Sequence, residues 1–242
     1  MKSPIFAALL LSMSLFSACA LAGDNGDSNE HSIAFSWNIE ATYPQTGEEK
    51  ADQAIRAWVK RIMTSAFGDI SEHIAIDPDS PEENSWDMSV GYAMSQPSDK
   101  IVSLLCIVYT YPGRAAHPSG HMETLNIIKQ DGTPLALSDL FEKPDQALVI
   151  FAEHSKELVT DWFGKNNPDA AKSLTTDAWF DAGFEAVPEN YSVLQLEPEG
   201  IRIHFQQYQI LPYAFGMSEA FFPLDMLAPA GPKAGIWGEA KK

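Results

Sequence analysis

The strongest constraint on the fold is the run Ile101 to Tyr109, which carries no charge and is apolar on both faces. A strand of this kind lies inside a sheet and is covered on both sides. The chain then passes through a Gly/Pro/His loop at residues 112–120 and returns in the extended run Met122 to Lys129. An Asp131-Gly132 pair follows, which is a strong signal for a tight turn. The other elements are arranged around this hairpin.

Two strands and a helix are predicted before the hairpin. Residues 31–43 alternate between apolar and polar side chains, and residues 86–94 do so again, which is typical of half-buried strands. Between them, Thr46 and Glu49 form a capping box in front of an apolar stripe at helical spacing that ends at Gly68. The acidic, proline-containing segment 77–85 is predicted to be a loop between subregions.

Helices and a second hairpin are predicted after it. The helical pattern that begins at Pro144 ends at Gly164, and a shorter one covers residues 177–183. Residues 191–205 form two apolar strands around a Glu-Pro-Glu-Gly turn, and residues 219–224 form a last strand.

The order of these elements predicts an α+β fold, an antiparallel-rich sheet with helices packed on it. A small N-terminal strand-helix subdomain is followed by a larger strand-helix-hairpin domain. The expected segments are a signal peptide at 1–22, a polar leader at 23–30, the N-terminal subdomain at 31–84, the C-terminal domain at 85–227 and a flexible tail at 228–242.

The N-terminus predicts export to the periplasm or to the outer membrane. Lys2 precedes a short apolar core and small residues, as in a secretory signal. Two processing sites compete. Ala20-Leu21-Ala22 suits an ordinary signal peptidase, whereas Ser17-Ala18-Cys19 resembles a lipobox that leaves Cys19 acylated. No later stretch is apolar and long enough for a membrane span.

The chain is strongly acidic, with a formal net charge of −17 from 33 acidic and 16 basic residues. Removal of residues 1–22 deletes Lys2 and no acid, so the mature charge is 15 − 33 = −18. This charge argues against nucleic acid or anionic lipid as partners. It leaves two interpretations open: an acidic coat that maintains solubility, or a face that attracts a basic partner.

No catalytic motif is recognised. Cys106 lies in the apolar run and is predicted to be a buried hydrophobe. His117, His121 and Glu123 could supply three metal ligands, so a metal-assisted hydrolase of envelope polymers is the alternative function. Pro118 and Gly120 interrupt the histidine pair, however, so we expect no metal site, no cofactor and no enzymatic activity.

The segment Phe205 to Gly216 is rich in aromatic and glutamine residues. Tyrosines such as Tyr208 and Tyr213 suit a protein-binding surface, because they combine a broad apolar face with a hydroxyl. The same residues could equally cap a core, and the sequence does not decide between these roles.

Several motifs, taken in order, resemble the extracytoplasmic domain of the RsiV-type anti-sigma factors, a domain that also accompanies some peptidoglycan deacetylases. They are Tyr109-x-Tyr111, Gly113, Ala116-His117-Pro118, Asp131-Gly132, Leu137 to Phe141, Phe205 to Ile210, Pro212-Tyr213-Ala214, Gly216 and the strand Phe221 to Leu224. Residues 33–67 resemble the smaller domain that usually precedes it.

The resemblance implies a sensor or binding module, since the anti-sigma members bind lysozyme, a small basic protein. We expect an ectodomain alone, without a sigma-binding segment, a transmembrane helix or a deacetylase domain. Its partner is expected to be a lysozyme-like protein or a peptidoglycan fragment. The contact residues that the resemblance implies are Tyr111, Arg114, His117, Tyr208 and Tyr213.

Overall fold

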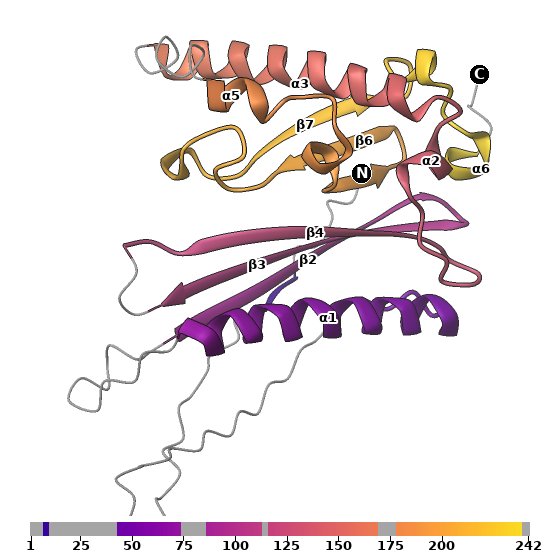
Figure 1. The fold of residues 1–242 in the computed structure, drawn as a ribbon. Coiled ribbons are helices and arrows are strands. Elements are labelled where there is room, and N and C mark those ends of the chain that lie inside the picture. The colour runs from indigo at the N-terminus through magenta and orange to yellow at the C-terminus, as the bar shows by residue number, and fades with distance from the viewer. Residues whose placement is uncertain (1–6, 10–42, 74–85, 113–115, 169–177, 239–242) are drawn as a thin grey trace, which may run out of the picture.

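The structure is a computed structural model that describes residues 7–9, 43–73, 86–112, 116–168 and 178–238. Four layers are stacked in the order helix, sheet, sheet, helix (Figure 1). The α+β prediction is confirmed. Residues 31–42 of the predicted strand and the leader at 23–30 lie outside the described residues, as does Arg114.

The first sheet has the strand order β1-β2-β3-β4, and all its pairs are antiparallel. The second sheet has the order β5-β6-β7 and is also antiparallel. The strands are β1 (Ala7–Leu9), β2 (Trp86–Ser98), β3 (Ile101–Pro112), β4 (Ser119–Ile128), β5 (Leu194–Glu197), β6 (Gly200–Phe205) and β7 (Ser218–Pro223). The central strand, the return strand and the second hairpin therefore form where the sequence predicted them.

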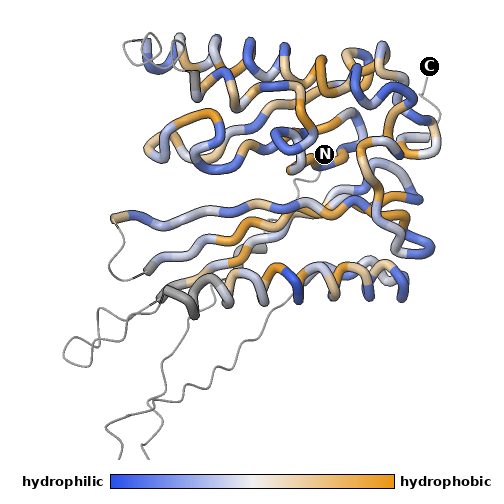
Figure 2. Tube along the Cα trace, viewed as in Figure 1, coloured by the Kyte–Doolittle hydropathy of each residue, from blue (hydrophilic) through white to orange (hydrophobic). Residues whose placement is uncertain are grey.

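Two long helices cover the outer faces of the two sheets. They are α1 (Glu49–His73) and α3 (Pro144–Asn166). The short elements are α2 (Leu137–Leu140), α5 (Ala178–Ala182), α6 (Ala234–Trp237), η2 (Pro188–Tyr191), η3 (Tyr213–Phe215) and η4 (Ala228–Ala230). Hydrophobic residues recur along the strands of both sheets (Figure 2), and the buried ones form the cores beneath the two long helices.

Helix α1 starts where the sequence predicted a cap, but a different carboxylate closes its first turn. The backbone N–H and the hydroxyl of Thr46 both donate to Oδ1 of Asp52, at 2.7 and 2.8 Å. Glu49 hydrogen-bonds with Gln53 instead. The capping-box prediction therefore chose the wrong acid, because Asp52 lies one turn further along the helix and can still reach back over Thr46.

The face of α1 that carries Ile55, Trp58 and Ile62 packs on the first sheet. Cys106 lies in this core and is almost fully buried. Burial raises the pKa of its thiol to about 12, so the thiolate that a nucleophile needs is not formed at neutral pH. The prediction that Cys106 acts as a small hydrophobe is confirmed.

The second sheet packs on α3 through a core rich in phenylalanine. The ring of Phe151 on α3 meets Phe222 of β7 edge to face, with centroids 4.9 Å apart. Phe163, near the end of the same helix, meets Phe215 in the same manner at 4.7 Å. Such contacts add about 0.5–1.5 kcal/mol each beyond the area that they bury.

The two sheets are joined by hydrogen bonds between side chains of the first sheet and the backbone of β5. The Leu196 N–H donates to Oγ of Ser103 at 2.8 Å, and the Leu194 N–H donates to Oγ1 of Thr124 at 3.1 Å. Nδ2 of Asn126 donates to the Leu194 carbonyl at 2.9 Å. We call the hydrogen bonds of Ser103, Thr124 and Asn126 to β5 the seam between the sheets. They give the backbone groups at the free edge of β5 the partners that a neighbouring strand would supply.

The far C-terminal segment is not the flexible tail that the glycines and prolines indicated. Ile236 of α6 is buried in the core of the second sheet, and Trp237 donates its indole N–H to the Glu197 carbonyl at 3.1 Å. Pro232 forms a bridge with Phe141. The buried side chains therefore hold residues 228–238 in place, although their glycines and prolines favour a flexible chain.

The seam predicts a specific loss of stability. In the Ser103→Ala variant, the buried Leu196 N–H loses its acceptor, so the free energy of unfolding should fall by about 1–3 kcal/mol in a urea titration. Ser155→Ala is the matched control, because Ser155 is equally buried on α3 and its hydroxyl has no partner. The control should change stability little, and equal losses in the two variants would show that the seam contributes nothing.

Candidate functional site

The segment that follows β6 is fastened to the edge of β4 by glutamine side chains. The Gln206 amide accepts the Met122 N–H at 3.0 Å and donates to the Met122 carbonyl at 2.6 Å, so it replaces the peptide group of a neighbouring strand. Gln207 accepts the Gly120 N–H at 3.0 Å. Gln209 donates to the Asn190 carbonyl at 2.8 Å and accepts the Gln206 N–H at 3.0 Å. These three glutamines, for which the sequence suggested no role, therefore determine the backbone course of the segment after β6.

Tyr208 lies between these fastened glutamines and has an unusual backbone. Its φ is +65°, and among the described residues no other non-glycine residue has a positive φ. A conformation of this kind costs about 1–3 kcal/mol and is retained only where the surroundings enforce it. The side chain is 48% exposed despite this constraint. A rigidly held, exposed tyrosine is typical of a binding surface.

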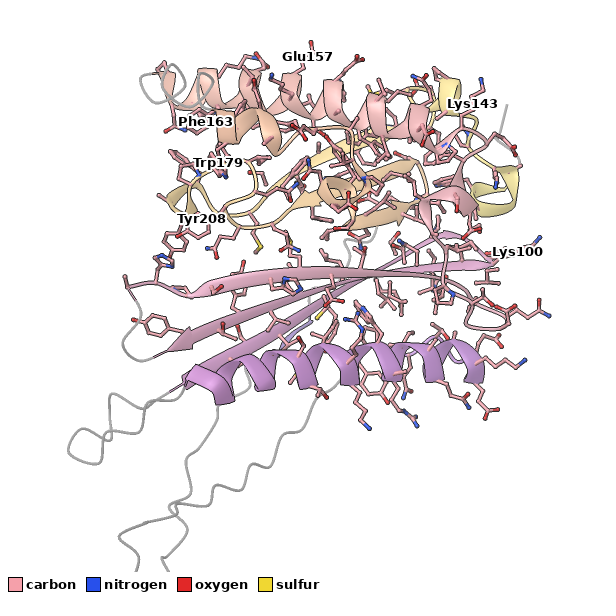
Figure 3. The ribbon with its side chains drawn as sticks, viewed as in Figure 1. Lys100, Lys143, Glu157, Phe163, Trp179 and Tyr208 are labelled. Atoms are coloured by element: carbon pink, nitrogen blue, oxygen red, sulfur yellow. The ribbon has the colours of Figure 1, made fainter. Side chains whose placement is uncertain are left out.

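Three aromatic side chains, His117, Tyr208 and Tyr213, gather at this point, and we call them the ring cluster. The imidazole of His117 stacks on Tyr213 with centroids 3.8 Å apart and an interplanar angle of 17°. The hydroxyl of Tyr208 lies 3.0 Å from Nε2 of His117, and the two tyrosine rings are 6.3 Å apart. Figure 3 shows Tyr208 at one end of the molecule, between the two sheets.

The hydrogen bonds define the tautomer of His117. Nδ1 lies 3.1 Å from the Pro118 carbonyl, and a carbonyl oxygen only accepts, so Nδ1 carries the hydrogen. In the neutral imidazole, Nε2 then accepts the hydroxyl hydrogen of Tyr208. The Tyr208 oxygen keeps its lone pairs for a donor from outside the protein.

Two further residues extend the surface and were missed by the sequence analysis. An added Cβ at Gly120 would lie 3.0 Å from a ring carbon of Tyr109 and 3.5 Å from the sulfur of Met217. The Tyr109 ring therefore lies against β4 beside Met217, and it is 41% exposed. Its position two residues before Tyr111 on the same face of β3 is the signal that could have identified it.

The site residues expected from the sequence are only partly brought together. His117, Tyr208 and Tyr213 form one cluster, and their assignment to a contact surface stays a prediction. Tyr111 is exposed near the end of β3 and is not in contact with these rings through any interaction in the described residues. Arg114 lies outside the described residues.

The histidines of the alternative metal site do not converge. His121 lies 3.4 Å from Oε1 of Glu123, which also pairs with Arg61 of α1, on the face of β4 that is turned toward α1. Hydrogen bonds from His121 and Arg61 hold the pKa of Glu123 at about 2. His117 is engaged by Pro118 and Tyr208 instead. Across the described ranges, no three potential metal ligands cluster.

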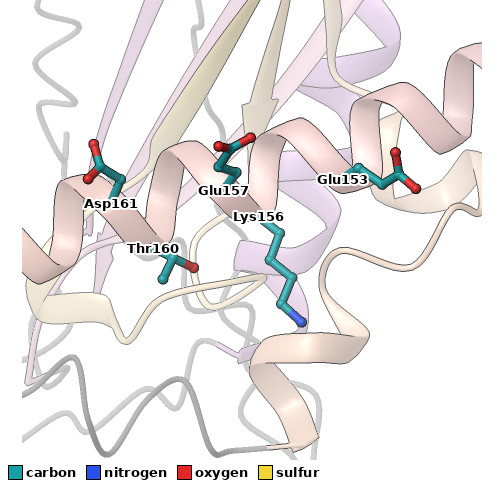
Figure 4. Close-up of a pocket in the computed structure, with 5 residues that line it drawn as sticks. All are labelled: Glu153, Lys156, Glu157, Thr160 and Asp161. Atoms are coloured by element: carbon teal, nitrogen blue, oxygen red, sulfur yellow. The ribbon is translucent and has the colours of Figure 1, made fainter.

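A shallow depression of about 580 Å³ lies elsewhere, on the outer face of α3 (Figure 4). Its lining includes Glu153, Glu157 and Asp161, spaced four residues apart, and Lys156, which pairs with Asp181 at 2.8 Å. Part of the acidic charge of the chain therefore gathers along one helix. Asp161 pairs with Lys165 at 2.5 Å, and Glu157 lies 3.8 Å from Nδ1 of His154.

Residues 138–225 match the family model described as "Protein of unknown function (DUF3298)". This range begins in α2 and ends just after β7, so it contains α3, the second sheet and two members of the ring cluster. No helix among the described residues is both long and apolar enough to cross a membrane. No curated protein matches the chain.

Two solved structures are similar to the chain. A member of the DUF3298 family from Bacteroides fragilis NCTC 9343 is 19% identical, with 78% of this chain and 69% of that chain covered and a TM-score of 0.46. A DUF3298 family protein from Pseudomonas aeruginosa PAO1 is 17% identical, with 61% and 65% covered and a TM-score of 0.41.

The Gln206 amide predicts a local effect on β4. The Gln206→Ala variant leaves the Met122 N–H and carbonyl without partners, so the Met122 amide should exchange its hydrogen faster. The free energy of unfolding should also fall by about 1–3 kcal/mol. Gln53→Ala on the exposed surface of α1 is the control and should affect neither quantity. Unchanged exchange at Met122 in the Gln206 variant would contradict the assigned pairing.

Proposed function

We propose that this chain is an exported, non-enzymatic binding module of the cell envelope that contacts its partner through the ring cluster. The observation that carries the proposal is the hydrogen-bonded, stacked arrangement of His117, Tyr208 and Tyr213, in which Tyr208 is exposed and the other two rings are half-buried. Ordering of flexible side chains is a major cost of association, and here the rings are already held in place before a partner arrives.

The chemistry of the cluster favours a partner that donates hydrogen bonds and carries positive charge. The Tyr208 oxygen offers lone pairs, and tyrosine faces attract cationic groups such as the arginine guanidinium. The net charge of −17 would accelerate the approach of a basic protein. A lysozyme-like protein fits these requirements, and this partner follows from the resemblance to the RsiV-type domain.

A peptidoglycan fragment is the second ligand that the resemblance offers. Its sugar hydroxyls could donate to the same oxygen of Tyr208 and its amides to the exposed acceptors around it. In this proposal the module reaches the envelope by its export signal, with Cys19 either acylated or removed with the signal peptide.

Calorimetric titration of the chain with a basic c-type lysozyme tests the proposal. Tyr208→Ala and Tyr213→Ala should each weaken binding by about 10-fold or more, because truncation of a central interface tyrosine commonly costs about 2 kcal/mol. Trp162→Ala, which removes a 51% exposed aromatic on α3 outside the cluster, is the control and should bind as the unaltered chain does.

The titration should be made at two salt concentrations, because exposed charges more than about 8–10 Å apart are screened at physiological ionic strength. Binding that survives the higher salt and depends on the two tyrosines supports the proposal. Binding that vanishes with salt, or that ignores both substitutions, contradicts the assigned contact surface. A chain that binds neither lysozyme nor peptidoglycan fragments would contradict the proposed function itself.

A further inference from the structure

The facing surfaces of the two sheets diverge from a shared apolar cluster. Leu105 of β3, Met122 of β4 and Val193, just before β5, form that cluster. Side chains two residues apart on a strand share a face, so Leu105, Tyr109 and Tyr111 all point toward the second sheet. Leu105 is 5% exposed, whereas Tyr109 is 41% and Tyr111 39% exposed. Solvent therefore reaches this face of β3 beyond the cluster.

The second sheet shows the same gradient on the face that is turned away from α3. Ile203 of β6 packs in the core beneath that helix, so Arg202 and His204 point the other way, where the order of the layers places the first sheet (Figure 1). His204 is 7% exposed, whereas the side chains of Arg202 and of Glu219 on β7 are 28% and 53% exposed. We call these two solvent-accessible surfaces the diverging faces.

A network of planar polar side chains covers the second sheet's share of the diverging faces. Arg202 donates from Nε to Oε1 of Glu197 at 2.6 Å and from Nη1 to Oε1 of Glu219 at 2.7 Å. Its guanidinium lies over the ring of Phe221, 5.2 Å from the centroid. Burial, followed by the charge of Arg202, lowers the pKa of His204 to about 4, so its imidazole is neutral at pH 7. The network therefore holds one positive and two negative charges in fixed positions.

The first sheet's share of the diverging faces is aromatic beside an open space. Gly91 of β2 lies opposite Ile107 of β3 in register, on the same face as Tyr109 and Tyr111. A Cβ added to Gly91 would meet no atom within 4 Å, and its φ is not in the left-handed region. Two tyrosine rings thus adjoin a flat stretch of strand that no side chain covers.

The charges of the network select the class of ligand. An anion would meet the two carboxylates, and a cation would meet the guanidinium, which already lies over Phe221. A hydroxyl group both donates and accepts, so it can bond at once to an Arg202 N–H and to an oxygen of Glu219. Arg202 uses three of its five N–H groups within the network, so two remain.

We propose that the diverging faces bind a neutral glycan, with sugar rings packed on Tyr109 and Tyr111 over Gly91 and sugar hydroxyls bonded to Arg202 and Glu219. The C–H hydrogens of a sugar ring suit the electron-rich face of tyrosine. The proposal gives Tyr111 a contact that the ring cluster does not provide. It rests on the proposed function as a binding module but uses a different surface, so the two can fail separately.

Calorimetric titration of the full chain with the neutral tetramer of N-acetylglucosamine tests the proposal. Gly91→Val should weaken binding by about 5-fold or more, because the new side chain fills the open space without strain in the strand. Tyr111→Ala should weaken it by a similar factor, because a stacking face is lost.

Two matched controls should bind the tetramer as the unaltered chain does. Met94→Val changes the opposite face of β2, since Met94 lies opposite Leu104, which is buried in the core beneath α1. Trp162→Ala removes an exposed aromatic side chain on α3. Binding that Gly91→Val and Tyr111→Ala leave unchanged, or no binding of the tetramer at all, would overturn the proposal.

A second titration, with the deacetylated and therefore cationic tetramer, separates sugar recognition from attraction to the acidic chain. The neutral tetramer should bind at least as tightly, and added salt should not weaken its binding. Tighter binding of the cationic tetramer that vanishes with salt would overturn the proposal. A chain that binds lysozyme through the ring cluster but not the neutral tetramer would retain the proposed function and lose this inference alone.

Discussion

The contact on which the rest of the structure depends is the seam between the two sheets. A strand at a sheet edge exposes unpaired backbone groups, and β5 would be such an edge without Ser103, Thr124 and Asn126. Side chains of the first sheet satisfy these groups at 2.8–3.1 Å, so the second sheet is tied to the first without a continuous ladder. Apolar contacts also support the junction: Leu105, Met122 and Val193 form a small cluster there, and Ile101 of β3 packs into the core of the second sheet. Directed hydrogen bonds and apolar contacts therefore both fix how the layers meet.

The ring cluster is a consequence of this junction. His117 precedes β4 of the first sheet, whereas Tyr208 and Tyr213 follow β6 of the second. Their rings can stack only if both sheets keep their relative position, and Gln206 and Gln207 secure that position along the β4 edge. The strained backbone of Tyr208 is accordingly held by pairing on both sides. A surface assembled from two sheets in this way is rigid where it is exposed, which suits recognition of a partner.

Much of the fold is readable from the sequence, because its elements carry strong local signals. The uncharged run at 101–109, the turn at Asp131-Gly132 and the long helical stripes carry strong local signals, and these elements form. The helix ends were not predicted correctly, because α1 continues past Gly68 to His73 and α3 continues past Gly164 to Asn166. Two features were not predicted: the ordered structure of residues 228–238 and the capping of α1 by Asp52. Both depend on specific side-chain contacts, which the local sequence pattern does not reveal. The division of the chain into residues 31–84 and 85–227 stays a prediction.

The sequence named His117, Tyr208 and Tyr213, and their role as partner contacts stays a prediction, whereas the way in which they come together was not predicted. Tyrosines and a histidine in turn-rich segments indicate a surface, yet their meeting across about 90 residues of sequence depends on the seam. The roles of the glutamines were invisible because an amide that replaces a peptide group has no sequence signature. Tyr109 was quoted as part of a motif but was not named as a contact, because it continues an apolar run in which residues 101–106 are buried.

The most direct test of this account is the tautomer of His117, measured from the imidazole ¹⁵N chemical shifts of the free chain at pH 8, with the His117→Gln variant for assignment. A ring held between Pro118 and Tyr208 should be in the Nδ1–H form, with Nε2 as the acceptor. A ring in the Nε2–H form, or one that averages between both forms as a free imidazole does, would contradict a cluster assembled before the partner binds.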